Sequence, residues 1–295
     1  MARLKRALPF SIIKYYLLVS FGFVFLYPIL YMASYSLMDL PDLRSPFVNY
    51  IPTKLDFNNY NAAFTALNYW NALWTSIYVS FLPAAAQSVT ACVTAYGLAR
   101  FQFPGKRFIF GLVIAAFIIP PSITMLPQFM IYRDLGLIDT PFAFIIPATF
   151  GQGIRSSILI LVFYQIINTI PVSLDESALI DGAGPYKMFA RIALPLASAG
   201  FVISFLFSLI WYWNETTLST LYMGNRITTL PMQLDRFAIV YNRMLAGRTM
   251  QGEKSLNVAT YMAGTMLNVL PLLVFYFFTQ KQFVQSVDRS GITGE

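Results

Sequence analysis

Long apolar stretches separated by short polar segments dominate this chain. Six of them cover residues 12–34, 73–99, 108–131, 142–167, 196–222 and 258–279. Each offers about 20 helical residues, which is enough to cross a hydrocarbon layer of about 30 Å. Backbone polar groups find no water partners in lipid, so stretches this long and apolar form helices. The alternation typical of a β-barrel is absent. The pattern therefore predicts an all-α transmembrane protein of six spans, built as a single domain over residues 1–295.

The composition agrees with a membrane protein. The chain is 57% hydrophobic and 11% charged, whereas an average soluble domain is about 25% charged. A soluble fold of this length could not bury so much apolar surface. The first stretch follows Arg3, Lys5 and Arg6, and no small-residue cleavage site follows a short apolar core. We therefore expect a retained signal-anchor helix rather than a cleaved signal peptide.

The basic residues indicate an orientation. Six spans place both termini on one side, and with that side inside, eleven Lys and Arg lie in inner segments and eight in outer ones. The excess is concentrated in the first two inner segments, so both termini are predicted to be cytoplasmic. The net charge of +7 fits contact with lipid headgroups, and no basic run indicates nucleic acid. The long outer segments, 37–72 and 223–257, contain aromatic residues and Pro and are expected to fold as caps.

Several kinds of chemistry are missing from the sequence. It has no His and one cysteine, Cys92, which excludes a zinc site, a His-based triad and an internal disulfide. It also has no G-x-x-x-x-G-K-[ST] phosphate loop. We therefore predict no catalytic residue, no metal ligand and no cofactor bound by this chain.

One inner segment, residues 171–195, does not resemble a simple linker. Its sequence is PVSLDESALIDGAGPYKMFARIALP. Ser173 and Glu176 have the spacing of a capping box, so a short helix is expected to begin near Leu174. Gly182 and Gly184 can end that helix, because glycine accepts the left-handed conformation at a helix C-terminus.

A second short helix is expected to follow in the same segment. Pro185 suits its first turn, where the missing N–H is harmless, and Pro195 marks the break before the fifth span. The two helices would carry the apolar residues Leu179, Ile180, Met188, Phe189 and Ile192. Such a compact element could dock on a partner protein, or it could lie on the membrane surface.

The 171–195 segment resembles the EAA signature of ABC import permeases, which reads E-A-A, three residues, G, nine residues, I-x-L-P. The matching residues are Glu176, Ser177, Ala178, Gly182, Ile192, Leu194 and Pro195. Asp181, Gly182 and Ala183 add the D-G-A typical of the sugar-importing branch. Ser177 departs from the usual alanine, but serine is also small.

The resemblance extends from about Asn59 to the C-terminus. It includes N-Y before the second span, A-Y-x-x-A-R-F-x-F-P-G after it, Pro in the third span, W-N in the fifth and Q-x-F-V near the end. The residues concerned are Asn59, Tyr60, Ala95, Tyr96, Gly97, Leu98, Ala99, Arg100, Phe101, Phe103, Pro104, Gly105, Pro120, Pro127, Trp213, Asn214, Gln282, Phe283 and Val284. Thr75 and the last residues, GITGE, depart from the common pattern.

The resemblance implies a six-span ABC importer permease fold with cytoplasmic coupling helices in a bacterial plasma (inner) membrane. The most similar kind is the carbohydrate-uptake type that resembles the smaller maltose permease subunit. The implied partners are a second permease subunit in a heterodimer, two ATP-binding subunits that hold ATP and Mg, and an extracytoplasmic solute-binding protein. The substrate would be a sugar, moved by alternating access, and ATP hydrolysis would reside on the partner subunits.

Ionisable residues inside spans are costly and indicate function. Arg155 is expected near the middle of the fourth span and Glu215 in the outer half of the fifth. They either line the translocation path or satisfy each other or partner groups. Because sugars stack on aromatic faces and bind planar polar side chains, the substrate-path candidates are Gln152, Arg155, Trp211, Trp213, Asn214 and Glu215. The aromatic candidates could instead belong to an interfacial belt.

Other functions stay open on the sequence alone. They are an ABC permease for a non-sugar solute, a secondary transporter or channel, and a membrane scaffold. Within the sugar importers, an acidic oligosaccharide is favoured by Arg155 and by five basic residues in segment 223–257. Those outer charges could also dock the solute-binding protein.

Overall fold

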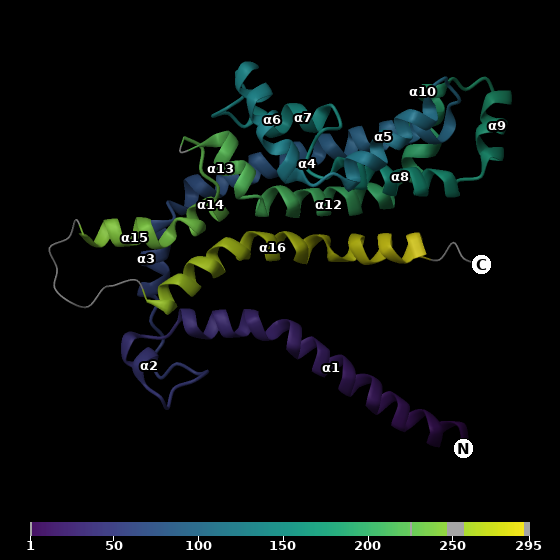
Figure 1. Cartoon of the computed structure of the whole chain (residues 1–295). Coiled ribbons are helices and arrows are strands. Elements are labelled where there is room, and N and C mark those ends of the chain that lie inside the picture. The colour runs from purple at the N-terminus through teal and green to yellow at the C-terminus, as the bar shows by residue number, and fades with distance from the viewer. Residues whose placement is uncertain (1, 225, 247–256, 292–295) are drawn as a thin grey trace. The chain divides into compact units, whose positions relative to one another are not determined.

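The computed structural model describes residues 2–224, 226–246 and 257–291, and all regular structure in these ranges is helical (Figure 1). The all-helical prediction is thus confirmed. The helices are α1 (Ala2–Ser36), α2 (Leu40–Arg44), α3 (Asn58–Ala66), α4 (Tyr69–Arg100), α5 (Lys106–Ile118), α6 (Pro121–Asp134), α7 (Phe142–Thr149), α8 (Ser156–Thr169), α9 (Val172–Ile180), α10 (Pro185–Met188), a π-helical turn η1 (Phe189–Ala193), α11 (Leu194–Leu196), α12 (Ser198–Asn214), α13 (Thr217–Met223), α14 (Leu230–Asp235), α15 (Phe237–Ala246) and α16 (Val258–Gly291).

Three helical stretches are each long and apolar enough to cross a membrane. They are Ile13–Ser36 in α1, Tyr69–Arg100 in α4 and Val258–Gln282 in α16. Three bent helix pairs also qualify if each pair is taken as one span, which gives up to six spans among the described residues. The first, second and sixth predicted spans therefore match single helices, whereas the other three are broken.

The predicted third span is bent by 106° between α5 and α6. The bend falls at Pro120 and Pro121. Pro120 adopts an extended conformation and Pro121 opens α6. Proline lacks the N–H of an α-helical hydrogen bond, and it disfavours helical geometry at the residue before it. The two consecutive prolines therefore end α5 and restart the helix in a new direction.

The predicted fourth and fifth spans are also interrupted. Residues 142–167 form two helices, α7 and α8, separated by residues 150–155. The fifth span ends at Asn214, and α13 follows as a separate helix from Thr217. At its other end α12 meets the α10–α11 stretch at an angle of 73°. Helices cover most of these two regions, but mean apolarity did not predict their breaks.

The described residues fall into two compact units. The first unit contains α1, α2, α3, α15 and the first part of α16. Asn59 is buried in it, and its amide nitrogen donates to the carbonyls of Ser36 (3.2 Å) and Met38 (2.9 Å). Thr260 in α16 donates to the Asn59 amide oxygen at 3.2 Å. One asparagine thus ties the end of α1 to α3 and α16.

Segment 37–57 of the first unit folds around a buried carboxylate. Asp42 is 4% exposed and accepts hydrogen bonds from the Thr53 N–H (2.8 Å) and hydroxyl (2.5 Å). The hydroxyl, helped by the backbone donors, holds the pKa of Asp42 below its usual range. The segment is therefore a folded element.

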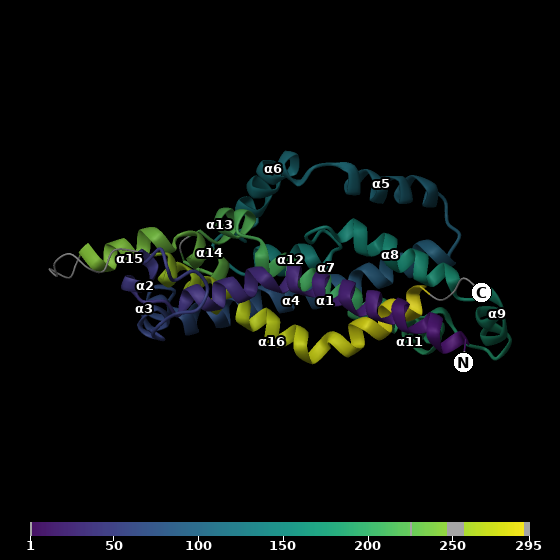
Figure 2. The same cartoon turned by 90° about the horizontal axis from the view of Figure 1, so that it is seen from below.

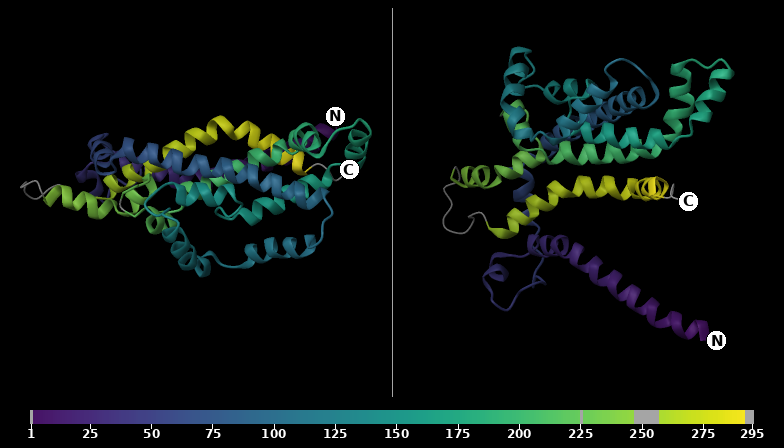
Figure 3. Two further views of the ribbon diagram at one scale, coloured as in Figure 1. Left: turned by 90° about the horizontal axis from the view of Figure 1, so that it is seen from above. Right: turned by 45° about the vertical axis from the view of Figure 1, so that its right-hand side comes forward.

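The second unit is organised along α4, which packs with α8 and α12 (Figures 1 and 2). Small α4 residues, including Ala91, Cys92 and Ala95, are fully buried against Phe163 and the start of α12. Small side chains allow helix backbones to approach closely in membranes. Figure 3 shows from two further sides that α9 lies at one end of this unit and α13 at the opposite end.

Candidate functional site

The backbone inside the second unit is irregular at the break between α7 and α8, which we call the α7–α8 break (residues 150–155). The carbonyl of Pro147 accepts a hydrogen bond from the N–H of Gln152 at 2.8 Å. Gly151 (φ 74°) and Arg155 (φ 54°) adopt the left-handed conformation, which costs a non-glycine residue about 1–2 kcal/mol. The prediction that Arg155 lies within a continuous span is wrong, because it is the residue that precedes the first turn of α8.

Side chains from α4 and α12 satisfy the polar backbone of this break. Gln87 of α4 is fully buried, and its amide nitrogen donates to the carbonyl of Ile154 at 2.8 Å. The hydroxyl of Tyr212 donates to the Gln87 amide oxygen at 2.8 Å and accepts from the Ile154 N–H at 3.1 Å. Both backbone polar groups of Ile154 are therefore paired with side chains from distant helices.

A cavity of about 750 Å³ lies beside the break. Parts of α5, α6, α7, α8, α12 and α13 surround it. Its apolar walls include Leu112, Val113, Phe117 and Phe144, and its polar lining is Thr124, Gln128, Tyr132, Gln152, Arg155, Ser156, Ser157, Tyr212, Glu215 and Tyr222. An apolar cavity with a few converging polar groups is the usual form of a small-molecule site.

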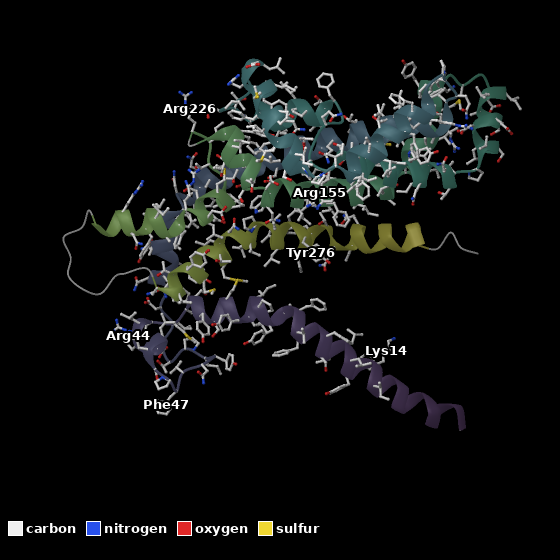
Figure 4. The ribbon with its side chains drawn as sticks, viewed as in Figure 1. Lys14, Arg44, Phe47, Arg155, Arg226 and Tyr276 are labelled. Atoms are coloured by element: carbon white, nitrogen blue, oxygen red, sulfur yellow. The ribbon has the colours of Figure 1, made fainter. Side chains whose placement is uncertain are left out.

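Arg155 is the cationic side chain of this lining. Its guanidinium carbon lies 5.3 Å from the centre of the Trp211 ring, within the range of a cation–π contact. Glu215 caps α13 by accepting from the N–H of Leu218 at 2.9 Å. Neither Arg155 nor Glu215 forms an ion pair with any residue that the structure describes. Figure 4 shows Arg155 between the two ends of the second unit. The alternative that the two charges satisfy each other is therefore not realised here.

The structure brings some of the sequence candidates together and leaves others apart. Gln152, Arg155 and Glu215 line the cavity. Trp211 does not line it but contacts the guanidinium of Arg155. Trp213 and Asn214 are not among its lining residues. Trp213 is buried, and its indole N–H has no partner among the described residues. The amide of Asn214 donates to Ile210 in its own helix at 3.0 Å.

Sequence reasoning missed several polar residues of this region. Gln128, Tyr132 and Tyr222 line the cavity, and Gln87 supports the break. Gln87 could have been predicted from its position in the apolar stretch 73–99, because a polar amide in the middle of such a stretch needs a buried partner. Gln128 directly follows Pro127 of the third span.

The 171–195 segment forms the two expected short helices at one end of the second unit (Figure 1). Gly182 (φ 74°) follows the last residues of α9. Its N–H bonds to Leu179 at 3.0 Å, and the N–H of Ala183 bonds to Ala178 at 2.9 Å. These two bonds are those of a Schellman motif, which satisfies the free carbonyls of a helix end. Pro185 then opens α10, as predicted.

The predicted capping box is wrong. α9 begins at Val172 rather than near Leu174, with Pro171 at the cap position and no side-chain cap bond. Of the apolar residues expected on the segment, Leu179 and Ile180 are exposed, whereas Met188 is buried. Leu179, Ile180 and Tyr186 are exposed, at 58%, 87% and 91%.

Two other apolar residues of this segment, Met188 and Phe189, face inward. Met188 is buried, and the ring of Phe189 lies 5.0 Å from that of Tyr96 on α4. Of the signature residues, Glu176 and Ser177 are exposed and Ala178 is buried. Ser177 donates to Leu174 in its own helix at 3.0 Å. The outer surface of the segment is therefore made by α9 and the start of α10.

An ion pair joins this segment to α4. The Nε of Arg100 lies 2.8 Å from the Oδ2 of Asp175 in α9, and both side chains are about a tenth exposed, at 11% and 10%. Arg100 also donates through Nη2 to the carbonyl of Ile170 at 2.8 Å. The last residue of α4 is thereby linked to the start of the 171–195 segment.

Comparison with known proteins places this arrangement in context. Residues 87–289 match the family model described as binding-protein-dependent transport system inner membrane component. A trehalose transport system permease protein of Mycobacterium tuberculosis is 28% identical over 91% of this chain and 93% of its own length. A polygalacturonan/rhamnogalacturonan transport system permease protein of Bacillus subtilis is 27% identical over 97% and 98%.

A solved structure shares the fold. A chain of a bacterial ABC transporter involved in the import of the acidic polysaccharide alginate superposes with a TM-score of 0.73 and is 22% identical. The match covers 93% of this chain and 96% of that one.

Proposed function

Because this chain belongs to the family of binding-protein-dependent transport system inner membrane components, we propose that it is the permease subunit of an ABC importer for sugars or oligosaccharides. The observation that supports a sugar as the substrate is the cavity beside the α7–α8 break. There Arg155, Gln152 and Glu215 converge between aromatic and apolar walls. Planar polar groups and aromatic faces together suit a hydroxyl-rich ring. The named functions of the two curated relatives support the same substrate class.

The proposal includes six spans, of which the third (α5 and α6), the fourth (α7 and α8) and the fifth (α12) are the interrupted ones. It also includes two cytoplasmic termini in a bacterial inner membrane and a single permease domain. Further support comes from the excess of Lys and Arg in the inner segments. The α7–α8 break is irregular backbone that lines the cavity, and a membrane protein tolerates such backbone where it lines a cavity or is buried in protein.

We assign the 171–195 segment to docking on an ATP-binding subunit. Its residues Glu176, Ser177, Ala178, Asp181, Gly182, Ala183, Ile192, Leu194 and Pro195 carry the EAA pattern. Leu179, Ile180 and Tyr186 give it an exposed apolar surface, the kind of surface that marks a protein contact. Two ATP-binding subunits would hold ATP and Mg, and their closure would move this segment.

The remaining partners follow from the same proposal. A second permease subunit would complete the pore, and an extracytoplasmic solute-binding protein would deliver the sugar to the outer segments. Transport would proceed by alternating access. Among sugars we favour an acidic oligosaccharide, because the guanidinium of Arg155 has no carboxylate partner among the described residues and would gain one from a uronic acid.

The test is ATP hydrolysis by the complete complex in lipid nanodiscs, supplied with its solute-binding protein and either neutral or uronic-acid oligosaccharides. We expect one sugar class to stimulate hydrolysis. Stimulation by an amino acid or phosphate instead would favour a permease for another solute, and ion-driven flux without hydrolysis would favour a secondary transporter.

The same assay tests the 171–195 segment with Gly182→Pro. Proline fixes φ near −65°, whereas Gly182 has φ 74° and uses its N–H in the Schellman motif. We expect assembly to persist and stimulation to be lost. Gly184→Ala is the matched control, because Gly184 has φ −74° and an added Cβ meets nothing within 4 Å. Normal stimulation in Gly182→Pro would show that this segment does not transmit the ATPase movement.

A further inference from the structure

We propose that Gln87 and Tyr212 are positioning residues that hold the α7–α8 break in one conformation and so fix Arg155 at the cavity. The inference rests on the proposed function of that cavity. Neither residue carries a charge, and Gln87 is not part of the cavity lining. Their role is exerted through the backbone of Ile154.

The first step concerns Gln87. Its side chain is fully buried within α4. Its amide nitrogen donates to Ile154 (2.8 Å) and to the hydroxyl of Ser208 (3.4 Å), and its amide oxygen accepts from Tyr212 (2.8 Å). A buried amide with its donor and acceptor both used is held in one orientation, because any rotation would leave a polar group without a partner.

The second step concerns the backbone of the break. An α-helix satisfies its own N–H and C=O groups, but a break inside a membrane protein must find other partners. Ile154 finds both of them here, since its carbonyl accepts from Gln87 and its N–H donates to the Tyr212 hydroxyl. The two side chains thus replace the hydrogen bonds that an uninterrupted helix would have made.

The third step is the close approach at Gly153. A Cβ built at this position would lie 2.0 Å from the Gln87 amide oxygen and 2.4 Å from the Tyr212 hydroxyl. The backbone therefore packs directly against the two polar groups. One residue beyond Ile154, Arg155 keeps its left-handed conformation at φ 54°, and such a conformation persists only where its surroundings hold it.

The last step connects this arrangement to Arg155. Trp211, which lies under the guanidinium, directly precedes Tyr212 on α12. Successive helical residues point about 100° apart. One turn of α12 therefore provides both the contact of Tyr212 with Ile154 and the contact of Trp211 with Arg155. The hydroxyl of Tyr212 fixes the backbone just before Arg155, and the ring of Trp211 supports the end of its side chain. The guanidinium is thereby preorganised for a substrate group instead of being free to move.

The experiment compares Tyr212→Phe and Gln87→Leu with Ser204→Ala in the complete complex in nanodiscs. Ser204 is the matched control, because it is a fully buried hydroxyl on α12 without a hydrogen-bond partner among the described residues. The first readout is amide hydrogen exchange in peptides that cover residues 150–158. We expect at least tenfold faster exchange in both test variants, and no change in Ser204→Ala.

The second readout is sugar-stimulated ATP hydrolysis with trigalacturonate and maltotriose as probes. We expect the half-saturating concentration of the stimulating sugar to rise about tenfold in Tyr212→Phe, with the maximal rate little changed, since small misplacements of a positioned group cost one to two orders of magnitude. Arg155→Gln should have a similar effect. Adding Tyr212→Phe to Arg155→Gln should have little further effect, because both variants disrupt one contact.

Unchanged exchange in both test variants would overturn the positioning role. Full additivity of Tyr212→Phe with Arg155→Gln would also overturn it, because the two residues would then act separately. If Arg155→Gln leaves the sugar response unchanged while the test variants exchange faster, the proposed function of the cavity fails and the structural role of Gln87 and Tyr212 stands.

Discussion

The ion pair between Arg100 and Asp175 is expected to stabilise the contact between α4 and the 171–195 segment. The perturbation is Asp175→Asn, which leaves the guanidinium of Arg100 about a tenth exposed and without its counter-charge, 2.8 Å away in the wild type. Removing one partner of a buried ion pair costs about 3–5 kcal/mol. The bond from Arg100 to Ile170 remains, so we expect the lower value, about 3 kcal/mol.

The chain provides a matched control in Arg133 and Asp134. Their nitrogen and oxygen lie 3.1 Å apart, a distance similar to that of the first pair, but the side chains are 58% and 68% exposed. An exposed pair contributes about 0–1 kcal/mol. Asp134→Asn should therefore leave the melting temperature of this subunit almost unchanged. Asp175→Asn should lower it by about 5 °C, because the unfolding entropy is about 2.1 cal/mol/K for each of the 295 residues.

The assays are thermal unfolding and receptor-stimulated ATP hydrolysis of the same nanodisc samples. We expect Asp175→Asn to lose most of the stimulation while it keeps basal hydrolysis. The double variant Arg100→Met with Asp175→Leu should be more stable than either single variant, because no charge is left buried. Equal melting temperatures in Asp175→Asn and Asp134→Asn would refute the reasoning, and a double variant less stable than both singles would do so too.

Two further outcomes follow from other contacts. Gly153→Ala should lower stability by about 2 kcal/mol or more in thermal unfolding, because the added Cβ would meet the amide of Gln87 at 2.0 Å; Gly111→Ala, with nothing within 4 Å, should be neutral or slightly stabilising. Asp42 has a lowered pKa in the folded state through Thr53, so its stabilising contribution is complete above its unfolded pKa of about 4 and is lost as pH falls through the folded value. Unfolding measured from pH 6 to pH 3 should show this loss, and Thr53→Val should make the loss smaller; an equal loss in both proteins would contradict the assignment.

The parts of the fold that could be predicted from the sequence depend on local chemistry. The left-handed turn at Gly182 and the start of α10 at Pro185 were predicted correctly, because glycine and proline fix the backbone without help from distant residues. Mean apolarity likewise predicted where helices lie. The start of α9 was predicted two residues too late, since Pro171 takes the cap position that we had assigned to Ser173.

The way in which a break is held could not be predicted from hydropathy. The α7–α8 break reads FGQGIR and is more polar than the helices around it, but its backbone is satisfied by Gln87 and Tyr212, which lie 67 and 58 residues away from Ile154 in the chain. Such long-range pairing has no local signature. The same reason explains why Arg155 was placed inside a helix, although its presence in the candidate site was predicted.

The length of α4 has a mechanical consequence. From Gln87 to Arg100 the helix is uninterrupted, and the 13 steps between these two residues rise about 20 Å. A hydrogen-bonded helix of this length resists compression along its axis. An axial displacement of 1–2 Å imposed at Arg100, typical of helix shifts in switching proteins, would therefore reach Gln87 almost undiminished. Distance measurements between spin labels near the two ends of this stretch, with and without ATP, would show whether α4 moves as a rigid rod.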